Sequence, residues 1–152
     1  MTCLYKYKFY SDFMRKHITQ KDQFGCGVAC VAFVLGVNYK KAMTLFKNGN
    51  KKSKSTGFLC NEIVTALNSS IYKYGYIKQN IQKNIYKDKT IVFIKRSKPY
   101  PFGHYLVRSE NYWMDPWLNF KENLNLIEAK SGFRKRLPGK AIYYINKKTL
   151  IN

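Results

Sequence analysis

The sequence predicts an α+β protein in which helices come first and an antiparallel sheet follows. Three observations support this class. An unbroken run of apolar or small residues, Val28 to Leu35, reads as a helix without a polar face. Two further stretches before residue 68 have apolar residues at helical spacing. After residue 70, short segments rich in β-branched and aromatic residues are separated by turn residues, which is typical of strands. Helices followed by such strands favour an α+β architecture.

The helical half is expected to be built around the apolar run. Residues 20–25 form a polar loop into this central, buried helix, and Gly36 ends it, because glycine readily takes the left-handed conformation. Asn38 is expected to cap a second helix, Tyr39 to Phe46. Lys47 to Ser55 is interpreted as a polar surface loop. Ser55 or Thr56 then caps a third helix that runs through Leu67.

The second half is expected to supply the sheet. The predicted strands are Ile71 to Ile77, Thr90 to Lys95, Gly103 to Arg108, Tyr112 to Asp115 and Ala141 to Ile145. A short hairpin turn at residues 109–111 joins the third and fourth. Residues 98–103 form a loop that two prolines restrain, and residues 118–136 are irregular or partly helical.

The length of 152 residues suits one domain with its own core, so we expect residues 1–152 to form a single domain. Residues 1–19 are interpreted as a basic N-terminal arm or short helix. The longest apolar run is too short to span a membrane, and the N-terminus lacks the apolar core of a signal peptide. We therefore expect a soluble, cytoplasmic protein, or one delivered as an effector or toxin by a route that needs no N-terminal signal.

Cys26 stands at the expected start of the central helix, between Gly25 and Gly27. Unpaired N–H groups and the positive end of the helix dipole favour a thiolate there, and the two glycines let a substrate approach closely. The alternative is an inert core cysteine, which is common, and Cys30 is interpreted as such a packing residue. The four cysteines have neither metal-ligand spacing nor a dense disulfide pattern. We expect reduced thiols, no metal and no cofactor.

A nucleophilic cysteine needs a base and a group that orients the base. His104 opens one predicted strand and Asp115 ends the next. If the hairpin is centred between Ser109 and Glu110, His104 and Asp115 lie opposite each other at its open end. A carboxylate at that place fixes the imidazole tautomer. Taken alone, each residue has a structural alternative, since a lone histidine is often structural and Asp-Pro is a common turn.

The reaction also needs a hydrogen-bond donor for the oxyanion. Gln20 lies six residues before Cys26, in the loop that feeds the helix, and its side-chain amide can serve. Gln23 is the rival for this role.

These residues together resemble a known family. The pattern comprises Gln20, then Cys26-Gly27-x-Ala29-Cys30, then Gly103-His104-Tyr105-Leu106-Val107, and finally Asp115-Pro116. It is similar to the bacteriocin-processing, double-glycine leader peptidases of bacteria, which are papain-like cysteine peptidases. The resemblance implies a papain-like fold, in which a central buried helix carrying the cysteine packs on an antiparallel sheet. It also implies Cys26 as nucleophile, His104 as general base, Asp115 as orienting residue and Gln20 as oxyanion donor.

The charge is the least usual feature of the composition. Lys and Arg number 28 and Asp and Glu only 8, which gives a net charge of +20. An AT-rich gene would enrich lysine but would not remove acidic residues. The balance indicates an anionic partner, which is either an acidic peptide or protein, nucleic acid or a membrane surface. A solvated basic surface without a specific ligand is the alternative.

Three functions follow from these observations. The first is a cysteine peptidase that cleaves a peptide or protein, including an acidic one, through Cys26, His104, Asp115 and Gln20. The second keeps the papain fold but acts as a glutamine deamidase or acyl transferase of the toxin or effector type, because all of these pass through the same thioester. The third is a basic nucleic-acid-binding protein without catalysis, although no recognised nucleic-acid motif is present.

Overall fold

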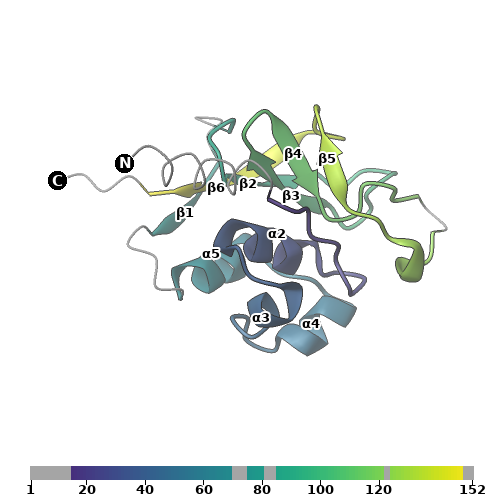
Figure 1. The fold of residues 1–152 in the computed structure, drawn as a ribbon, viewed down its shortest axis with the longest axis horizontal. Coiled ribbons are helices and arrows are strands. Elements are labelled where there is room, and N and C mark those ends of the chain that lie inside the picture. The colour runs from purple at the N-terminus through teal and green to yellow at the C-terminus, as the bar shows by residue number, and fades with distance from the viewer. Residues whose placement is uncertain (1–14, 70–74, 81–84, 122–123, 149–152) are drawn as a thin grey trace, which may run out of the picture.

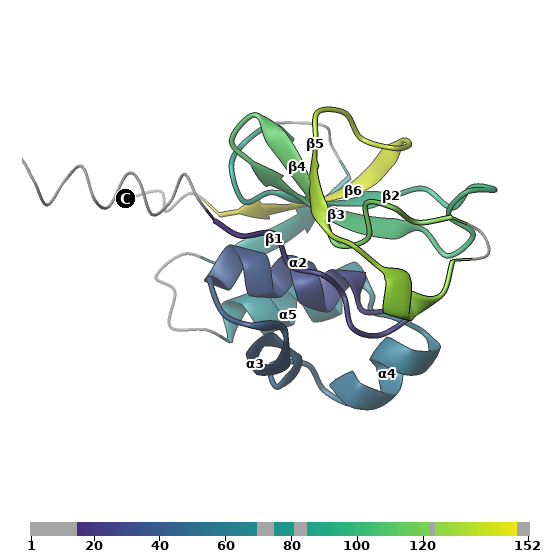
Figure 2. The same ribbon diagram turned by 45° about the vertical axis from the view of Figure 1, so that its right-hand side comes forward.

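The computed structural model describes residues 15–69, 75–80, 85–121 and 124–148. In these residues the helices lie on one face of an antiparallel sheet, with α2 and α5 next to the sheet and α3 and α4 farther away (Figures 1 and 2). The helices are α2 (Cys26–Leu35), α3 (Tyr39–Met43), α4 (Gly49–Ser55), α5 (Cys60–Asn68) and the 3-10 helix η1 (Leu126–Glu128). The strands are β1 (Tyr76–Gln79), β2 (Ile91–Ile94), β3 (His104–Ser109), β4 (Tyr112–Asp115), β5 (Gly132–Arg134) and β6 (Ala141–Lys147). The predicted α+β class is confirmed.

Within the described residues the strands form one sheet in the order β1-β6-β2-β3-β4-β5, and every neighbouring pair is antiparallel. The central strands β2 and β3 are buried on both faces. One face packs against the helices, and the other holds a smaller cluster around Leu106 and Trp113. No helix in the described part of the chain is long and apolar enough to cross a membrane.

The central helix is α2, as predicted. Every residue from 27 to 34 is buried, so the helix needs no polar face. It packs against β3, α3 and α5. Gly36 ends it with a φ of 67°, and the Gly36 N–H donates to the carbonyls of Ala32 and Phe33. These contacts fix where the first residue of the helix, Cys26, lies relative to the sheet.

The prediction of a polar loop from Lys47 to Ser55 is wrong, because residues 49–55 form the helix α4. Asn48 turns the chain with a φ of 55°, and the Lys52 N–H donates to the Asn48 carbonyl at 2.9 Å. Ser53 is fully buried, and its carbonyl accepts the Phe24 N–H at 2.8 Å. This contact joins α4 to the loop before Cys26. Packing against the rest of the protein stabilises this short helix, which the polar sequence alone does not predict.

The two neighbouring helices have different bounds from those predicted. α3 ends at Met43 rather than Phe46, although Asn38 caps it as expected, since the Asn38 side chain accepts the Lys41 N–H at 2.8 Å. α5 begins at Cys60 rather than at residue 56, because Gly57 has a φ of 72° and interrupts the helical path. The cap comes instead from within the helix, where the Glu62 carboxylate accepts the Leu59 N–H at 2.7 Å.

Most predicted strands are found within a few residues of their expected bounds. The first differs, since β1 covers residues 76–79 and residues 71–74 lie outside the described part of the chain, as do Cys3 and residues 1–14. Residues 118–136 contain η1, in keeping with a partly helical segment, but also the unpredicted strand β5. β5 is only three residues long and is stabilised by pairing with β4, a contact that local sequence does not reveal.

Candidate active site

Cys26, His104 and Asp115 are brought together by three different elements. Cys26 is the first residue of α2, His104 the first of β3 and Asp115 the last of β4. His104 Nε2 lies 2.7 Å from Asp115 Oδ1, and both side chains are almost completely buried. Cys26 and His104 line the same cavity, which has a volume of about 800 Å³. The sequence therefore identified three residues that converge on one place.

The predicted register of the hairpin between β3 and β4 is wrong, because each residue of β3 pairs with a residue of β4 two positions away from the expected one. Val107 pairs with Met114 and Ser109 with Tyr112, so Glu110 and Asn111 form the turn. Glu110 takes a φ of 50°, which allows a two-residue turn. His104 and Asp115 are therefore diagonal neighbours on one face of the sheet, not directly opposite. Their side chains still meet, because diagonal residues on adjacent strands lie within reach of long side chains.

The buried histidine favours its charged form. Burial lowers the pKa of His104, but the hydrogen bond to Asp115, the charge of Asp115 and the neighbouring Cys26 outweigh it and raise the pKa to about 10. Because Asp115 engages Nε2, Nδ1 is the ring nitrogen that remains for Cys26. An imidazolium beside a thiol is the arrangement that supports a thiolate.

Asp115 is held as a carboxylate by its own surroundings. Burial raises its pKa, but His104, the Trp117 N–H and Arg134 together bring the pKa below its ordinary value. Oδ1 accepts the Trp117 N–H at 3.0 Å in addition to its contact with His104. The Asp-Pro turn thus does more than end a strand, since it presents this N–H to the carboxylate.

The two remaining cysteines of the described chain differ from Cys26. Cys30 is fully buried, and burial, Cys26 and Asp115 raise its pKa well above the ordinary value. Cys60 is buried as well, and burial raises its pKa. Cys26 is partly exposed and faces the cavity. All three are free thiols, and only Cys26 combines access with a basic neighbour.

Gln20 is close to the site but directs its amide group into its own loop. The side chain is buried and lines the cavity together with Gln23 and Cys26. Its Nε2 donates to the carbonyls of Asp22 and Gln23, at 3.0 and 3.1 Å, and its Oε1 has no hydrogen-bond partner among the residues that the structure describes. The Cys26 N–H, at the first position of α2, has no partner within the helix. The role of Gln20 as oxyanion donor stays a prediction.

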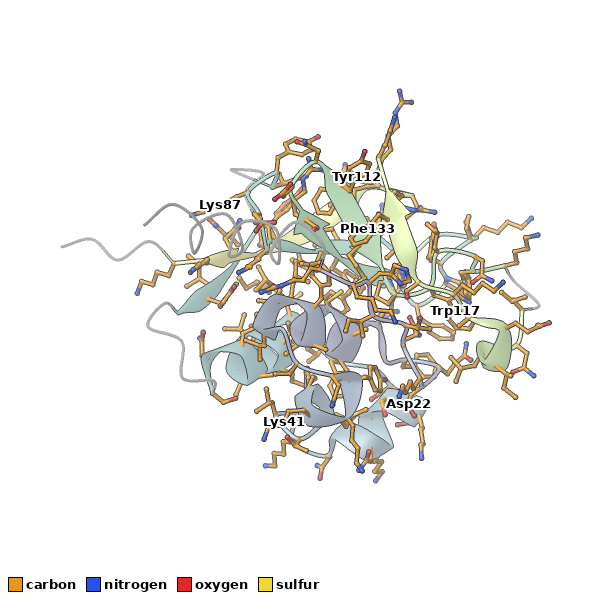
Figure 3. All side chains as sticks on the ribbon, viewed as in Figure 1. Asp22, Lys41, Lys87, Tyr112, Trp117 and Phe133 are labelled. Atoms are coloured by element: carbon orange, nitrogen blue, oxygen red, sulfur yellow. The ribbon has the colours of Figure 1, made fainter. Side chains whose placement is uncertain are left out.

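Sequence reasoning missed an aromatic stack that covers the histidine. The Tyr100 ring lies parallel to the His104 imidazole, with centroids 5.2 Å apart and an interplanar angle of 15°. Phe120 stacks on the other side of Tyr100 at 5.5 Å, and Trp117 meets Phe120 edge-on at 4.9 Å. Figure 3 shows Trp117 on the chain that follows β4, at the same end of the molecule as Asp22. The run Pro99-Tyr100-Pro101, three residues before His104, was the available signal.

The cavity is lined by aromatic, polar and basic side chains and is partly open to solvent. Phe24, two residues before Cys26, meets Phe102, two residues before His104, edge-on at 5.1 Å. Phe102 and Leu59 are both largely exposed at the rim. These residues give part of the cavity that Cys26 lines a hydrophobic wall, which is typical of ligand pockets.

No protein-family model matches this chain, and comparison with the curated proteins and with the solved structures finds no significant match either. Among the described residues, no group of three or more His, Cys, Asp or Glu side chains is arranged to hold a metal ion.

Proposed function

We propose that this protein is a papain-like cysteine peptidase that cleaves a peptide or protein substrate. The observation that carries the proposal is the buried 2.7 Å contact between His104 and Asp115 at the wall of the cavity that Cys26 lines. A buried acid–base pair beside a partly exposed thiol at a helix start is the arrangement that nucleophilic catalysis requires. The helix-on-sheet architecture that positions the pair is in keeping with the papain-like fold that the sequence resembles.

The chemistry follows from the roles of the three side chains. The Cys26 thiolate attacks the carbonyl carbon of the scissile peptide bond, and the developing oxyanion is stabilised by the Cys26 N–H and a second donor, for which Gln20 is proposed. The His104 imidazolium gives its proton to the leaving amine as the C–N bond breaks, which leaves a thioester on Cys26. His104, now neutral, takes a proton from water, and the hydroxide releases the acyl group as a carboxylic acid.

Asp115 orients the His104 imidazole throughout this cycle. By accepting from Nε2 it leaves Nδ1 to exchange protons with the thiol and the leaving group. It also stabilises the imidazolium, which agrees with the raised pKa of His104.

The net charge of +20 favours an acidic peptide or protein as the substrate. Among the described residues that line the cavity, Glu62 is the one carboxylate, and it is paired with Lys52. Lys78, Lys95 and Arg96 line the same cavity without an acidic partner there. Negative charge on a substrate would therefore meet little repulsion at this place.

Selective alkylation tests the proposal without knowledge of the substrate. Limiting iodoacetamide near neutral pH should modify Cys26 before Cys3, Cys30 and Cys60, as located by peptide mass mapping. His104→Ala should slow the labelling of Cys26, because it removes the imidazolium that supports the thiolate. Cys60→Ala is the matched control, since it removes a thiol of the same cavity and should leave the Cys26 rate unchanged. Equal labelling of all thiols would contradict the proposal.

A second experiment identifies the reaction. Wild-type protein incubated with a mixed peptide pool and quenched in acid should carry an acyl group on Cys26, detected by its added mass. New peptide N-termini indicate a peptidase, whereas release of ammonia without cleavage indicates a deamidase.

A further inference from the structure

Arg134 lies against the one oxygen of Asp115 that the catalytic histidine does not use. Asp115 Oδ1 accepts from both His104 and the Trp117 N–H. Asp115 Oδ2 faces Arg134, whose Nε lies 3.4 Å away, and it has no hydrogen-bond partner in the described residues. The Asp115 side chain is completely buried, whereas that of Arg134 is 24% exposed. Arg134 thus reaches from solvent toward a carboxylate that solvent does not reach.

The buried carboxylate needs more than one partner to stay ionised. An isolated carboxylate without water is strongly disfavoured, and its pKa rises until it takes up a proton. His104 compensates on one side of Asp115. The Trp117 N–H also lowers the pKa of Asp115, and on the Oδ2 side the charge of Arg134 lowers it further. Without it, Oδ2 would be a buried acceptor with no compensating cation.

Arg134 also acts on the ring that covers the histidine. Burial raises the pKa of Tyr100, and the charge and hydrogen bonding of Arg134 oppose this effect. Tyr100 in turn lies flat against His104. The charge of Arg134 therefore acts on both groups next to the imidazole, namely the carboxylate at its edge and the tyrosine ring on its face.

The strand pairing makes this placement a property of the fold. β5 runs beside β4, and Gly132 pairs with Asp115 while Arg134 pairs with Trp113. Residues two apart on a strand share a face, so Arg134 occupies the diagonal position next to Asp115. His104 occupies the equivalent diagonal on the other side of β4. The carboxylate is flanked by a cation from each neighbouring strand.

From this geometry we propose that Arg134 is a positioning residue of the active site, which keeps Asp115 ionised and turned toward His104. The inference rests on the proposed function for its catalytic meaning, but the ion pair can be tested without activity. The titratable and charged groups that face Asp115 are His104 from β3, Tyr100 from the preceding loop, Arg134 from β5 and Cys30 from α2. Of these, only His104 and Arg134 carry positive charge.

The test is the pH dependence of Cys26 alkylation by iodoacetamide in Arg134→Gln. Protonation of Asp115 removes the negative charge that stabilises the imidazolium, so the labelling rate falls at low pH. This fall is the acid limb of the pH profile. Loss of a cation near a carboxylate raises its pKa by about one unit or more, so the acid limb should move about one pH unit upward. Arg134→Lys keeps the charge and should restore much of the wild-type limb. Arg136→Gln removes an equal charge from a nearby exposed residue and should leave the limb in place.

Two results would overturn the inference. One is an unmoved acid limb in folded Arg134→Gln, and the other is an equal shift in Arg136→Gln. A purely structural role would lower the labelling rate at every pH without moving the limb. If wild-type Cys26 showed no selective labelling at all, the proposed function would fail instead, so the two failures are distinguishable.

A second measurement serves if Arg134→Gln does not fold. The Asp115 carboxyl carbon is followed by ¹³C NMR in His104→Gln protein that retains Arg134. With the histidine cation gone, Asp115 should titrate at a lower pH than in the double variant His104→Gln with Arg134→Met, because Arg134 remains beside Oδ2 in the single variant. An equal titration of Asp115 in the two variants would overturn the inference whether or not the protein is an enzyme.

Discussion

The Gln20 side chain stabilises the loop before Cys26, and the proposed function gives it a second role as oxyanion donor. Its amide donates to two carbonyls of residues 22 and 23, and its backbone N–H donates to the Pro116 carbonyl at 3.3 Å. These bonds join the loop before Cys26 to the chain that follows Asp115. Donation to an oxyanion requires one amide proton to leave a loop carbonyl as the substrate carbonyl enters. Gln23 is exposed, and only its carbonyl takes part in these bonds.

We predict that Gln20→Ala slows acylation of Cys26 by about 10²–10³-fold, the usual cost of losing one oxyanion donor. The measurement is the burst of nitrophenol released from an activated peptidyl ester. Gln23→Ala is the control and should change the rate little. A larger loss in Gln23→Ala would show that Gln23 supplies the donor.

The positive charge of His104 also contributes to the free energy of unfolding, and its pKa determines whether this contribution grows or falls with pH. The pKa of His104 is raised to about 10 in the folded protein, above the ordinary histidine value. The folded state therefore binds a proton that the unfolded state releases. This contribution is fully present below the unfolded pKa and is lost as the pH rises through the folded pKa.

We predict that the free energy of unfolding falls between about pH 6.5 and pH 10 by up to about 1.4 kcal/mol per pH unit, the slope for one proton. Urea titrations of Cys26→Ala protein measure it without interference from the thiol. His104→Gln in the same background should lack this component of the slope. If the free energy of unfolding of the two proteins changed with pH in the same way, the imidazole would not be charged in the folded protein.

At the scale of elements, the loop before α2 is shaped by a contact with α3. The Tyr39 hydroxyl donates to the Asp22 carboxylate at 2.8 Å. Gly25, immediately before Cys26, lies against the same hydroxyl, and a Cβ at residue 25 would be only 1.9 Å from it. The first turn of α2 and the position of the thiol therefore depend on the absence of a side chain at this residue.

We predict that Gly25→Ala is destabilising and slows Cys26 alkylation, because the loop must move to relieve the clash. Core overpacking of this kind typically costs about 1–3 kcal/mol. Adding Tyr39→Phe removes the clashing hydroxyl, so the double variant should be less destabilised than the sum of the two single variants. Chemical denaturation of all four members of the cycle measures this coupling. Additive effects would mean that the contact does not limit the loop.

Elements with a local signal were predictable from the sequence. α2 was predictable because its apolar run and Gly36 are both local features, and β2, β3, β4 and β6 because their residue types favour strands. α4, β5 and the hairpin register were not, because they depend on tertiary contacts such as the Phe24–Ser53 hydrogen bond and the pairing of β5 with β4. Helix and strand propensities are weak beside such contacts.

The same distinction applies to the site. The proximity of Cys26, His104 and Asp115 was predictable because each stands at the end of an element that the sequence reveals. Tyr100, Phe120 and Arg134 were missed because their roles depend on packing across the sheet. Arg134 is followed by Lys135 and Arg136, and consecutive basic residues are typical of an exposed surface rather than of a partner for a buried carboxylate.

For the whole molecule, the charge of +20 sets how partners approach. A field of this size accelerates encounters with anions and weakens as salt is added. It attracts nucleic acid as well as acidic peptides, so attraction alone does not identify the partner. The proposed function distinguishes them, because a thiol with a buried imidazole is suited to acyl chemistry and not to cutting a phosphodiester. We therefore expect productive recognition of acidic protein substrates.

Modification of Cys26 by peptidyl chloromethyl ketones tests this expectation. A glutamate-containing peptide should react faster than its glutamine counterpart at low salt, and added salt should reduce the advantage. Lys95→Gln with Arg96→Gln, at the cavity wall, should reduce this advantage more than Lys40→Gln with Lys135→Gln, which remove equal charge outside the cavity. Excess duplex or single-stranded nucleic acid should compete poorly at physiological ionic strength. Strong, stoichiometric inhibition by nucleic acid under those conditions would instead identify a nucleic-acid-binding protein, because its specific contacts would survive the salt that screens a diffuse field.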